Sequence, residues 1–285
     1  MTVCVAVAVH DCIVFAADSA SSLVSTNSAT GESQIINVYD HGDKVFNLVK
    51  GLPICAMTCG MGNLGNASIA TLAKELRRRL STPELGDWYV NPEAYTMEEI
   101  AVKARHFLFD ERFNALNPPP PAPHSFEFWI GGYGSDFDQQ HEIWKLAIVN
   151  GVCDPPSKAL PEDYGWLAGG QPNAVTRLLL GHDQNLRQFL IDNSMPEASA
   201  DAVMSVIQSN SQAPVVFPNM PTRDAIDLAD FLVETTKRFV RFLPGADTVG
   251  GETDIAVVTK YEGFKWIRRK HFYPAALNPL ETDHA

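Results

Sequence analysis

The sequence predicts an α+β protein, a four-layer αββα sandwich in which two antiparallel sheets lie between helical layers. The expected strands come as neighbouring pairs separated by short turn-forming stretches, which favours hairpins. The expected helices come in consecutive pairs between those hairpins, whereas repeated βαβ units would alternate a helix with every strand. The chain has 285 residues, 45% of them hydrophobic, enough for one large core. We therefore expect a single domain over 1–273, with a helical insertion at about 182–221 and a tail at 274–285.

The N-terminal segment predicts the first hairpin. Valine occupies every odd position from Val3 to Val9 and small residues occupy the even ones, so this strand is expected to be buried on both faces. A second apolar run follows the polar tip at His10 and Asp11. A turn centred on His10 would pair Thr2 with Asp18 and so bring a hydroxyl and a carboxylate together. A slip of one residue would place them on opposite faces.

Apolar periodicity and turn-forming residues also predict the helices, strands and loops in the rest of the chain. The polar composition of residues 19–43 predicts a long surface loop, in which 35–39 could form a short strand. Thr96 and Glu99 form a capping box that begins a helix. The other expected elements are strands at 43–48 and 54–59, a helix carrying Ile69 to Leu80, strands at 126–130 and 142–149, a helix ending at Leu180, a helical hairpin or lid at about 182–221, a helix at 222–242, and closing strands at 255–259 and 264–268.

The charge balance bears on partners. Lysine and arginine total 22 against 34 acidic residues, a net charge of −12, and no basic cluster dominates. This composition disfavours nucleic acid or an anionic membrane surface as the main partner. No apolar stretch reaches the roughly 18 residues that a membrane span requires. No basic region precedes the apolar N-terminal run, so we do not expect a secretory signal.

The cysteines indicate the compartment. There are five, an odd number, and most lie inside apolar runs, which fits reduced thiols in a cytoplasmic protein better than a disulfide framework. Cys55 and Cys59 are better explained as buried small residues than as metal ligands. We therefore expect a cytoplasmic protein with no metal site and no cofactor.

Thr2 is the candidate nucleophile. Methionine before a small residue is commonly removed, and its removal here would leave a threonine with a free α-amine. Such a residue carries a hydroxyl nucleophile and, in its amine of near-neutral pKa, a general base. The alternative is that Thr2 merely begins a strand.

An ordered set of motifs resembles the proteasome-type N-terminal nucleophile (Ntn) hydrolases of the β-subunit kind, including bacterial homologues such as the ancestral β-subunit (Anbu) group. The motifs are the starting Thr2, Val14–Asp18, Asp43–Phe46 and Met57–Gly60, with weaker echoes at 129–133, 167–170 and 247–251. They span most of the chain in the family's order. The resemblance implies the Ntn hydrolase fold and a threonine peptidase.

The resemblance also implies a role for each site residue. Thr2 would attack the peptide carbonyl to form an acyl-enzyme, with its own α-amine moving the protons. Lys44 would lie beside the hydroxyl and Asp18 would pair with Lys44. The backbone N–H of Gly60 would hold the oxyanion. Asp247 would orient the terminal amine.

The chain departs from the family pattern in several places. The serines that normally contact the terminal amine are replaced by Gly169 and Gly250, so a bound water or a neighbouring side chain would have to substitute for them. Ala20 stands where arginine is usual, and the loop between Asp18 and Lys44 is longer than the family's.

Partners and alternatives follow from the resemblance. It implies a peptide or unfolded protein as substrate and a homo-oligomeric ring or spiral, while the sequence does not say whether an ATPase partner is needed. One alternative is a non-catalytic ring-forming subunit, and another is an Ntn amidase acting on small molecules. A remote one is a dinucleotide-binding oxidoreductase, because the glycines of Gly60–Gly65 fit the dinucleotide fingerprint. That reading requires a βαβ unit and a later acidic residue, and we find no second strand there.

Overall fold

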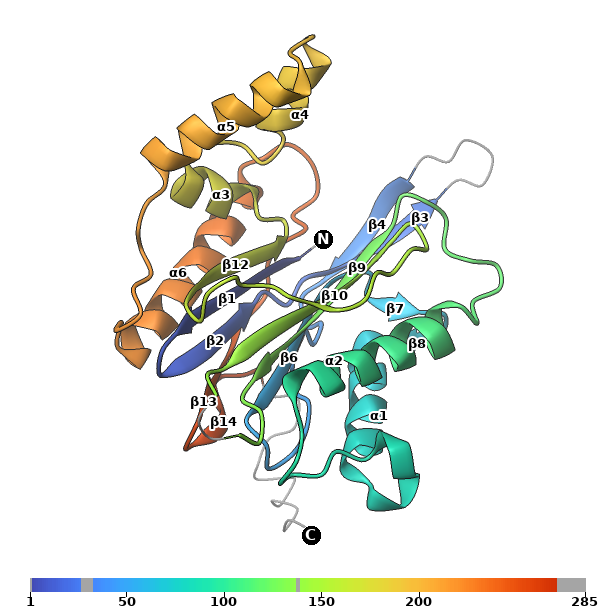
Figure 1. Cartoon of the computed structure of the whole chain (residues 1–285). Helices are drawn as coiled ribbons and strands as arrows, with labels where there is room; N and C mark the ends of the chain where they lie inside the picture. Colours follow the sequence, from blue (N-terminus) through green and yellow to red (C-terminus); the bar gives the residue numbers. More distant parts are fainter. Residues whose placement is uncertain (1, 27–32, 137–138, 271–285) are drawn as a thin grey trace.

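The computed structural model describes residues 2–26, 33–136 and 139–270. The expected tail at 274–285 lies outside the described residues. In the described part, two five-stranded antiparallel sheets run through the middle of the molecule (Figure 1). The prediction of an α+β protein with two antiparallel sheets is therefore confirmed.

The first sheet contains the N-terminal strand near its centre. Its strands, in spatial order, are β12 (Gly165–Gly170), β1 (Val3–Val9), β2 (Cys12–Ala17), β13 (Asp254–Thr259) and β14 (Gly263–Arg268). Both β1 and β2 are buried at every position, which explains their unbroken apolar composition.

The second sheet contains the strand that leads to the candidate oxyanion glycine. Its order is β11 (Ser157–Lys158), β10 (Glu142–Val149), β9 (Ser125–Gly132), β6 (Ile54–Gly60) and β5 (Val45–Asn47). Small residues of β1, such as Cys4 and Ala6, share one core cluster with Met57 and Trp129 of this sheet. The two sheets therefore pack face to face, and the small side chains of β1 allow the close approach.

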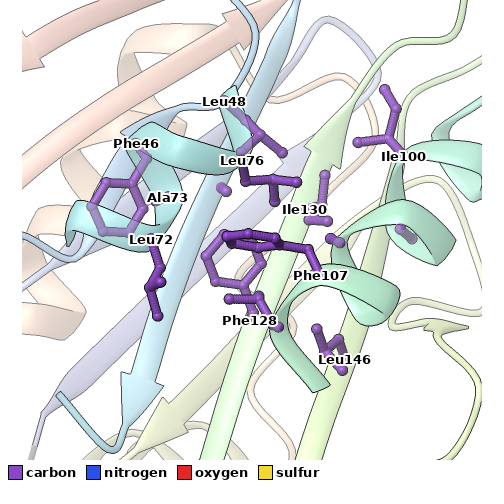
Figure 2. Close-up of a cluster of buried hydrophobic side chains, with 14 of the residues drawn as sticks. Phe46, Leu48, Leu72, Ala73, Leu76, Ile100, Phe107, Phe128, Ile130 and Leu146 are labelled. Atoms are coloured by element: carbon purple, nitrogen blue, oxygen red, sulfur yellow. The ribbon is translucent and has the colours of Figure 1, made fainter. Parts of the chain in front are cut away.

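Helices cover the outer faces of the two sheets (Figure 1). On the first sheet lie α3 (Asn173–Leu180) and α6 (Thr222–Arg241), whose apolar side chains pack against the valines of β1. On the second sheet lie α1 (Ile69–Ser81) and α2 (Met97–Arg105), which continues as a π-helical segment η2 (His106–Phe113). Figure 2 shows this outer core, where Leu76 and Phe107 from the helices meet Phe128 of the sheet.

The register of the N-terminal hairpin corrects the prediction. Cys4 pairs with Ala17 and Val9 with Cys12, so His10 and Asp11 form a two-residue turn and the register is shifted by one residue. Two-residue loops are the commonest hairpin connections. Because both faces of both strands are apolar, the burial pattern alone could not distinguish the two registers. Thr2 and Asp18 are therefore not directly opposite partners.

The segment 19–43 is also different from the prediction. Instead of a surface loop, it contains β3 (Ser21–Thr26) paired with β4 (Ser33–Tyr39) in an antiparallel hairpin. Several of its apolar side chains, including Leu23, Val24 and Ile36, are exposed. The serine-rich composition is typical of a loop, and the sequence predicts at most a short strand at 35–39. Short pieces complete the inventory of the described residues: β7 (Asn63–Leu64), β8 (Ala67–Ser68) and the 3₁₀ segment η1 (Pro83–Trp88).

The segment expected to be a helical insertion contains α4 (Leu186–Asp192) and α5 (Glu197–Ser211). This helical pair extends away from the sheets (Figure 1). Helix α4 has no buried residue, and α5 buries only Ala200. Past α5, the Ala213 backbone N–H donates to the Leu179 carbonyl at 2.7 Å, so the chain leaves and re-enters the body at neighbouring points.

Among the described residues, no helix is both long and apolar enough to cross a membrane.

Candidate active site

A cavity of about 300 Å³ lies where the N-terminal strand, the end of β6 and the start of α1 meet. Its walls include three residues expected at the site and several small polar ones: Thr2, Ser21, Lys44, Thr58, Gly60 and Ser68. Thr2 is 5% exposed, and it lies two positions before Cys4, whose side chain faces the opposite sheet. The cavity therefore joins elements that are far apart in the sequence.

A buried ion pair forms one wall of this cavity. Lys44 Nζ lies 2.5 Å from Asp18 Oδ1, and the side chain of Asp18 is fully buried. The same carboxylate oxygen accepts the Val3 N–H at 3.0 Å, while Oδ2 accepts the N–H groups of Ala20 at 3.1 Å and Gly250 at 3.0 Å. A buried carboxylate is stable only when its charge is compensated, and here a cation and three N–H donors compensate it. The Asp18 carboxylate is thereby fixed in one orientation.

The backbone of Thr2 is held by strand β12. The Gln171 N–H donates to the Thr2 carbonyl at 2.7 Å. Gly170, just before it, has φ of +75°, and a Cβ at this position would lie 2.0 Å from the Thr2 carbonyl oxygen. Only glycine allows that approach and that backbone conformation. The candidate nucleophile is thus attached to a rigid sheet.

Gly60 ends β6 and lies in the cavity wall. Its φ is +93°, and a Cβ there would lie 2.2 Å from the Ser125 carbonyl oxygen. The next residue, Met61, donates its N–H to that same carbonyl at 2.9 Å. A glycine is therefore required where the chain leaves the sheet on its way to α1.

None of the three residues expected around the terminal amine, Asp247, Gly169 and Gly250, lines this cavity. Asp247 is exposed and does not line the cavity. Gly250 uses its N–H for Asp18, and its carbonyl accepts the N–H groups of Ser19 and Ala20 at 2.9 and 3.0 Å. At Gly169 a Cβ would lie 2.6 Å from Trp129 Cζ2. The structure thus brings Thr2, Lys44, Asp18 and Gly60 together, while Asp247 lies apart.

Among the comparisons with known proteins, the one with solved structures gives a match. No protein-family model and no curated protein matches the sequence. The structure is similar to that of an ancestral β-subunit protein. That solved structure is "Anbu (ancestral beta-subunit) from Yersinia bercovieri", with 15% sequence identity and a TM-score of 0.48, and the match covers 95% of this chain and 89% of that chain.

The buried thiol of Cys4 lies close to the candidate site but is poorly suited to be a nucleophile. Burial raises the pKa of the Cys4 thiol well above its usual value, and the neighbouring Cys59 raises it further, while Lys44 opposes the shift only in part. The Cys4 thiol donates to the Thr58 carbonyl at 3.1 Å. Since the thiolate is the reactive form, Cys4 does not compete with Thr2 as a nucleophile.

Sequence reasoning missed two polar residues, Gln171, whose backbone N–H binds the Thr2 carbonyl, and its partner Thr248. Gln171 follows the close approach of Gly170, and its side-chain Nε2 donates to Thr248 Oγ1 at 3.4 Å. Thr248 is 1% exposed. The only sequence signal was their position directly after the weak motifs at 167–170 and beside Asp247.

The dinucleotide alternative is not supported by the topology. Every pairing in the two five-stranded sheets is antiparallel in the described part of the chain, so the glycines of Gly60–Gly65 do not belong to a βαβ unit. Over the same described ranges, no group of three or more His, Cys, Asp or Glu side chains is arranged to hold a metal ion.

Proposed function

We propose that this chain is a threonine peptidase whose nucleophile is Thr2, exposed as an N-terminal residue once Met1 is removed. The observation that carries the proposal is the buried Lys44–Asp18 pair, at 2.5 Å, whose lysine lines the same cavity as Thr2. Most ion pairs lie on surfaces, where they contribute little. A pair buried beside a hydroxyl in a cavity is instead typical of a functional site.

The reaction would follow the chemistry of these groups. The Thr2 hydroxyl oxygen forms a bond to the peptide carbonyl carbon, and its proton passes to the α-amine of the same residue. The tetrahedral intermediate then loses the C–N bond, and the amine returns the proton to the leaving group. Water attacks the resulting ester in the same way and releases Thr2.

Lys44 and Gly60 would stabilise the charges that develop. The Lys44 ammonium favours the alkoxide form of Thr2 and keeps the neighbouring α-amine neutral, because like charges disfavour each other. Asp18 holds that ammonium in place. The Gly60 N–H would bind the oxyanion, a contribution on the order of 3 kcal/mol for one donor.

The first test is the intact mass of the purified protein, followed by covalent labelling with a peptide boronate or a β-lactone. We expect Met1 to be absent and one probe to attach to Thr2, with labelling lost in Thr2→Ala. The same variant should keep the assembly state of the parent, which we propose is a homo-oligomeric ring or spiral. Retained Met1, or labelling that persists in Thr2→Ala, would contradict the assignment.

A second candidate is a non-catalytic subunit with the same fold. The observation in its favour is that Asp247 is exposed, Gly169 faces Trp129, and neither offers a side chain to the amine. A protein that lacks Met1 but does not react with either probe would support it. A third, an amidase for small molecules, would be labelled but would cleave small amides and leave peptides intact.

A further inference from the structure

A second buried lysine lies behind the Lys44–Asp18 pair. Lys270 follows β14 and its side chain is 4% exposed. Its Nζ donates to Asp254, and its backbone N–H donates to Asp254 Oδ1 at 3.0 Å. Asp254 is itself 3% exposed. This carboxylate already compensates the Lys270 charge.

The Lys270 ammonium makes two further contacts, in addition to the one with Asp254 that compensates its charge. Lys270 Nζ donates to Ser19 Oγ at 2.9 Å and lies 3.6 Å from Asp43 Oδ1. Ser19 is the residue after Asp18, and Asp43 is the residue before Lys44. One ammonium therefore touches the neighbours of both members of the candidate catalytic pair.

These contacts lie at the base of the β3–β4 hairpin, the segment that separates Asp18 from Lys44. The two ends of the hairpin are also joined by the Gly42 N–H, which donates to the Ser19 carbonyl at 2.8 Å. Ser19 Oγ in turn donates to the Glu252 carbonyl at 2.5 Å. The base of the hairpin is thus tied to the C-terminal strands through Ser19 and Lys270.

We propose that Lys270 is a positioning residue for the reaction of Thr2: it fixes the base of the β3–β4 hairpin so that Lys44 lies against Asp18 in the wall of the cavity. The proposal rests on the proposed function, since it concerns the rate of a reaction at Thr2. Lys270 does not line that cavity and has no contact with Thr2.

The charges around Lys270 decide what its removal does. Asp254 and Asp43 face it, and both also line a small neighbouring cavity with Lys74 and Arg77 of α1 and with Arg269. Without the ammonium, Asp43 loses the cation recorded beside it, and the surroundings of Lys44 become more negative. A protonated terminal amine is then favoured, so the acidic limb of the pH–rate profile should move to higher pH.

The test uses a double variant, Lys270→Met with Asp254→Leu, because replacing both members of a buried pair by apolar residues is commonly tolerated, whereas removing one is not. The measurement is the second-order rate constant for β-lactone labelling of Thr2 in the full chain. A misplacement of about 1 Å can cost on the order of 100-fold in rate, so we expect at least a tenfold loss. Because the double variant removes one charge of each sign, we expect its acidic midpoint to stay at the parent's value, whereas Lys270→Met alone, which removes only the positive charge, should move the midpoint to higher pH.

A matched control is the double variant Lys237→Met with Glu234→Leu. Lys237 Nζ also contacts a carboxylate and a hydroxyl, Glu234 Oε1 at 2.6 Å and Thr253 Oγ1 at 3.2 Å, but it lies on α6. We expect the labelling rate and its midpoint to equal those of the parent. Ser19→Ala provides a second, milder test should the first variant not fold, and we expect it to slow labelling without loss of folded protein.

The outcomes separate the two proposals. An unlabelled parent protein with Met1 removed would overturn the proposed function and this inference with it. A labelled parent, with the Lys270 double variant and Ser19→Ala both reacting at the parent's rate and Lys270→Met at the parent's midpoint, would overturn this inference alone. A variant that shows only a smaller labelled fraction, at an unchanged rate and midpoint, would also overturn it, because that result reflects stability alone.

Discussion

At the scale of single residues, Gly169 and Gly250, where the resemblance implies serine, have different surroundings. At Gly169 a Cβ would lie 2.6 Å from Trp129 Cζ2 and 3.1 Å from Cys59 Sγ. Trp129 is 2% exposed and cannot move aside cheaply. At Gly250 the one atom near a Cβ would be Asp40 Oδ1, at 4.0 Å. The packing explains the glycine at 169 and does not explain the one at 250.

The first prediction compares serine at these two positions. We expect Gly169→Ser to lower the free energy of unfolding by about 1–3 kcal/mol, the usual cost of overpacking a core. Gly250→Ser should change it little, because the new side chain enters open space. Urea denaturation of both variants measures the difference. Equal stability of the two variants would contradict this account of Gly169.

The second prediction separates stability from chemistry at the ion pair. Lys44→Ala leaves the Asp18 carboxylate buried without its cation, and such a loss costs about 3–5 kcal/mol. Thr2→Ala removes no buried charge and should leave stability close to that of the parent. Both should abolish labelling by the boronate, so thermal unfolding distinguishes variants that labelling cannot. Full activity in Lys44→Ala would remove Lys44 from the proposed mechanism.

The sequence was informative about some site residues and silent about others, for a physical reason. The first hairpin predicted that Thr2 and Asp18 lie close together, although in a register shifted by one residue, whereas the positions of Lys44 and Gly60 beside them were implied only by the resemblance to the proteasome-type Ntn hydrolases. Lys270 contacts Ser19 across 251 residues, and no local pattern encodes such a contact.

At the scale of elements, local sequence patterns predicted which helices and strands exist better than they predicted how the strands pair. The apolar periodicity of α1 and α6 predicted helices that the structure contains. The predicted register of β1 and β2 was wrong by one residue because both strands are apolar on both faces. The β3–β4 hairpin was missed because its apolar side chains face solvent and its serines resemble those of a loop.

The third prediction concerns the helical pair α4–α5. The Ala213 N–H donates to the Leu179 carbonyl, so the two ends of this excursion are adjacent, and the excursion itself buries only Ala200. Replacing residues 183–211 by a short glycine linker should therefore keep the fold, because closing a short loop costs little. Thermal unfolding measured by circular dichroism should remain cooperative. Loss of the cooperative transition would show that the pair supports the core. A control deletion removes the 20 residues of α6 and should prevent folding, because this helix carries seven buried residues: Ala225, Ile226, Ala229, Leu232, Val233, Thr236 and Val240.

At the scale of the whole molecule, a buried histidine connects the two sheets. His141, just before β10, has Nε2 2.6 Å from the Val9 carbonyl oxygen at the end of β1. Its ring also meets Tyr133 edge-on, with centroids 5.5 Å apart. Burial lowers the pKa of His141 below its ordinary value of 6.5, although the Val9 carbonyl and Asp163 oppose the shift. The neutral imidazole, with Nε2 as donor, is the form that the fold prefers.

The fourth prediction follows from that preference. Because the pKa is lower in the folded state, the unfolded chain takes up the proton first as pH falls. The stability contributed by His141 is thus present above its unfolded pKa and is lost as pH falls toward the folded value, by at most about 1.4 kcal/mol per pH unit for one proton. Urea denaturation at about pH 7.5 and 5.5 should show a smaller pH dependence in His141→Asn than in the parent. An identical dependence in both proteins would contradict the assignment.

The pairing of β2 with β13 joins residues 12–17 to residues 254–259, and Asp18 takes one of its donors from Gly250. Thr2, the proposed nucleophile, is therefore synthesised long before Gly250 and β13, which help to orient its neighbours. A growing chain therefore carries Thr2 for most of its synthesis without a site around it, and such long-range pairing also makes folding slow. Any reactivity of Thr2 would begin only after residues 250–259 have been synthesised and β13 has paired with β2.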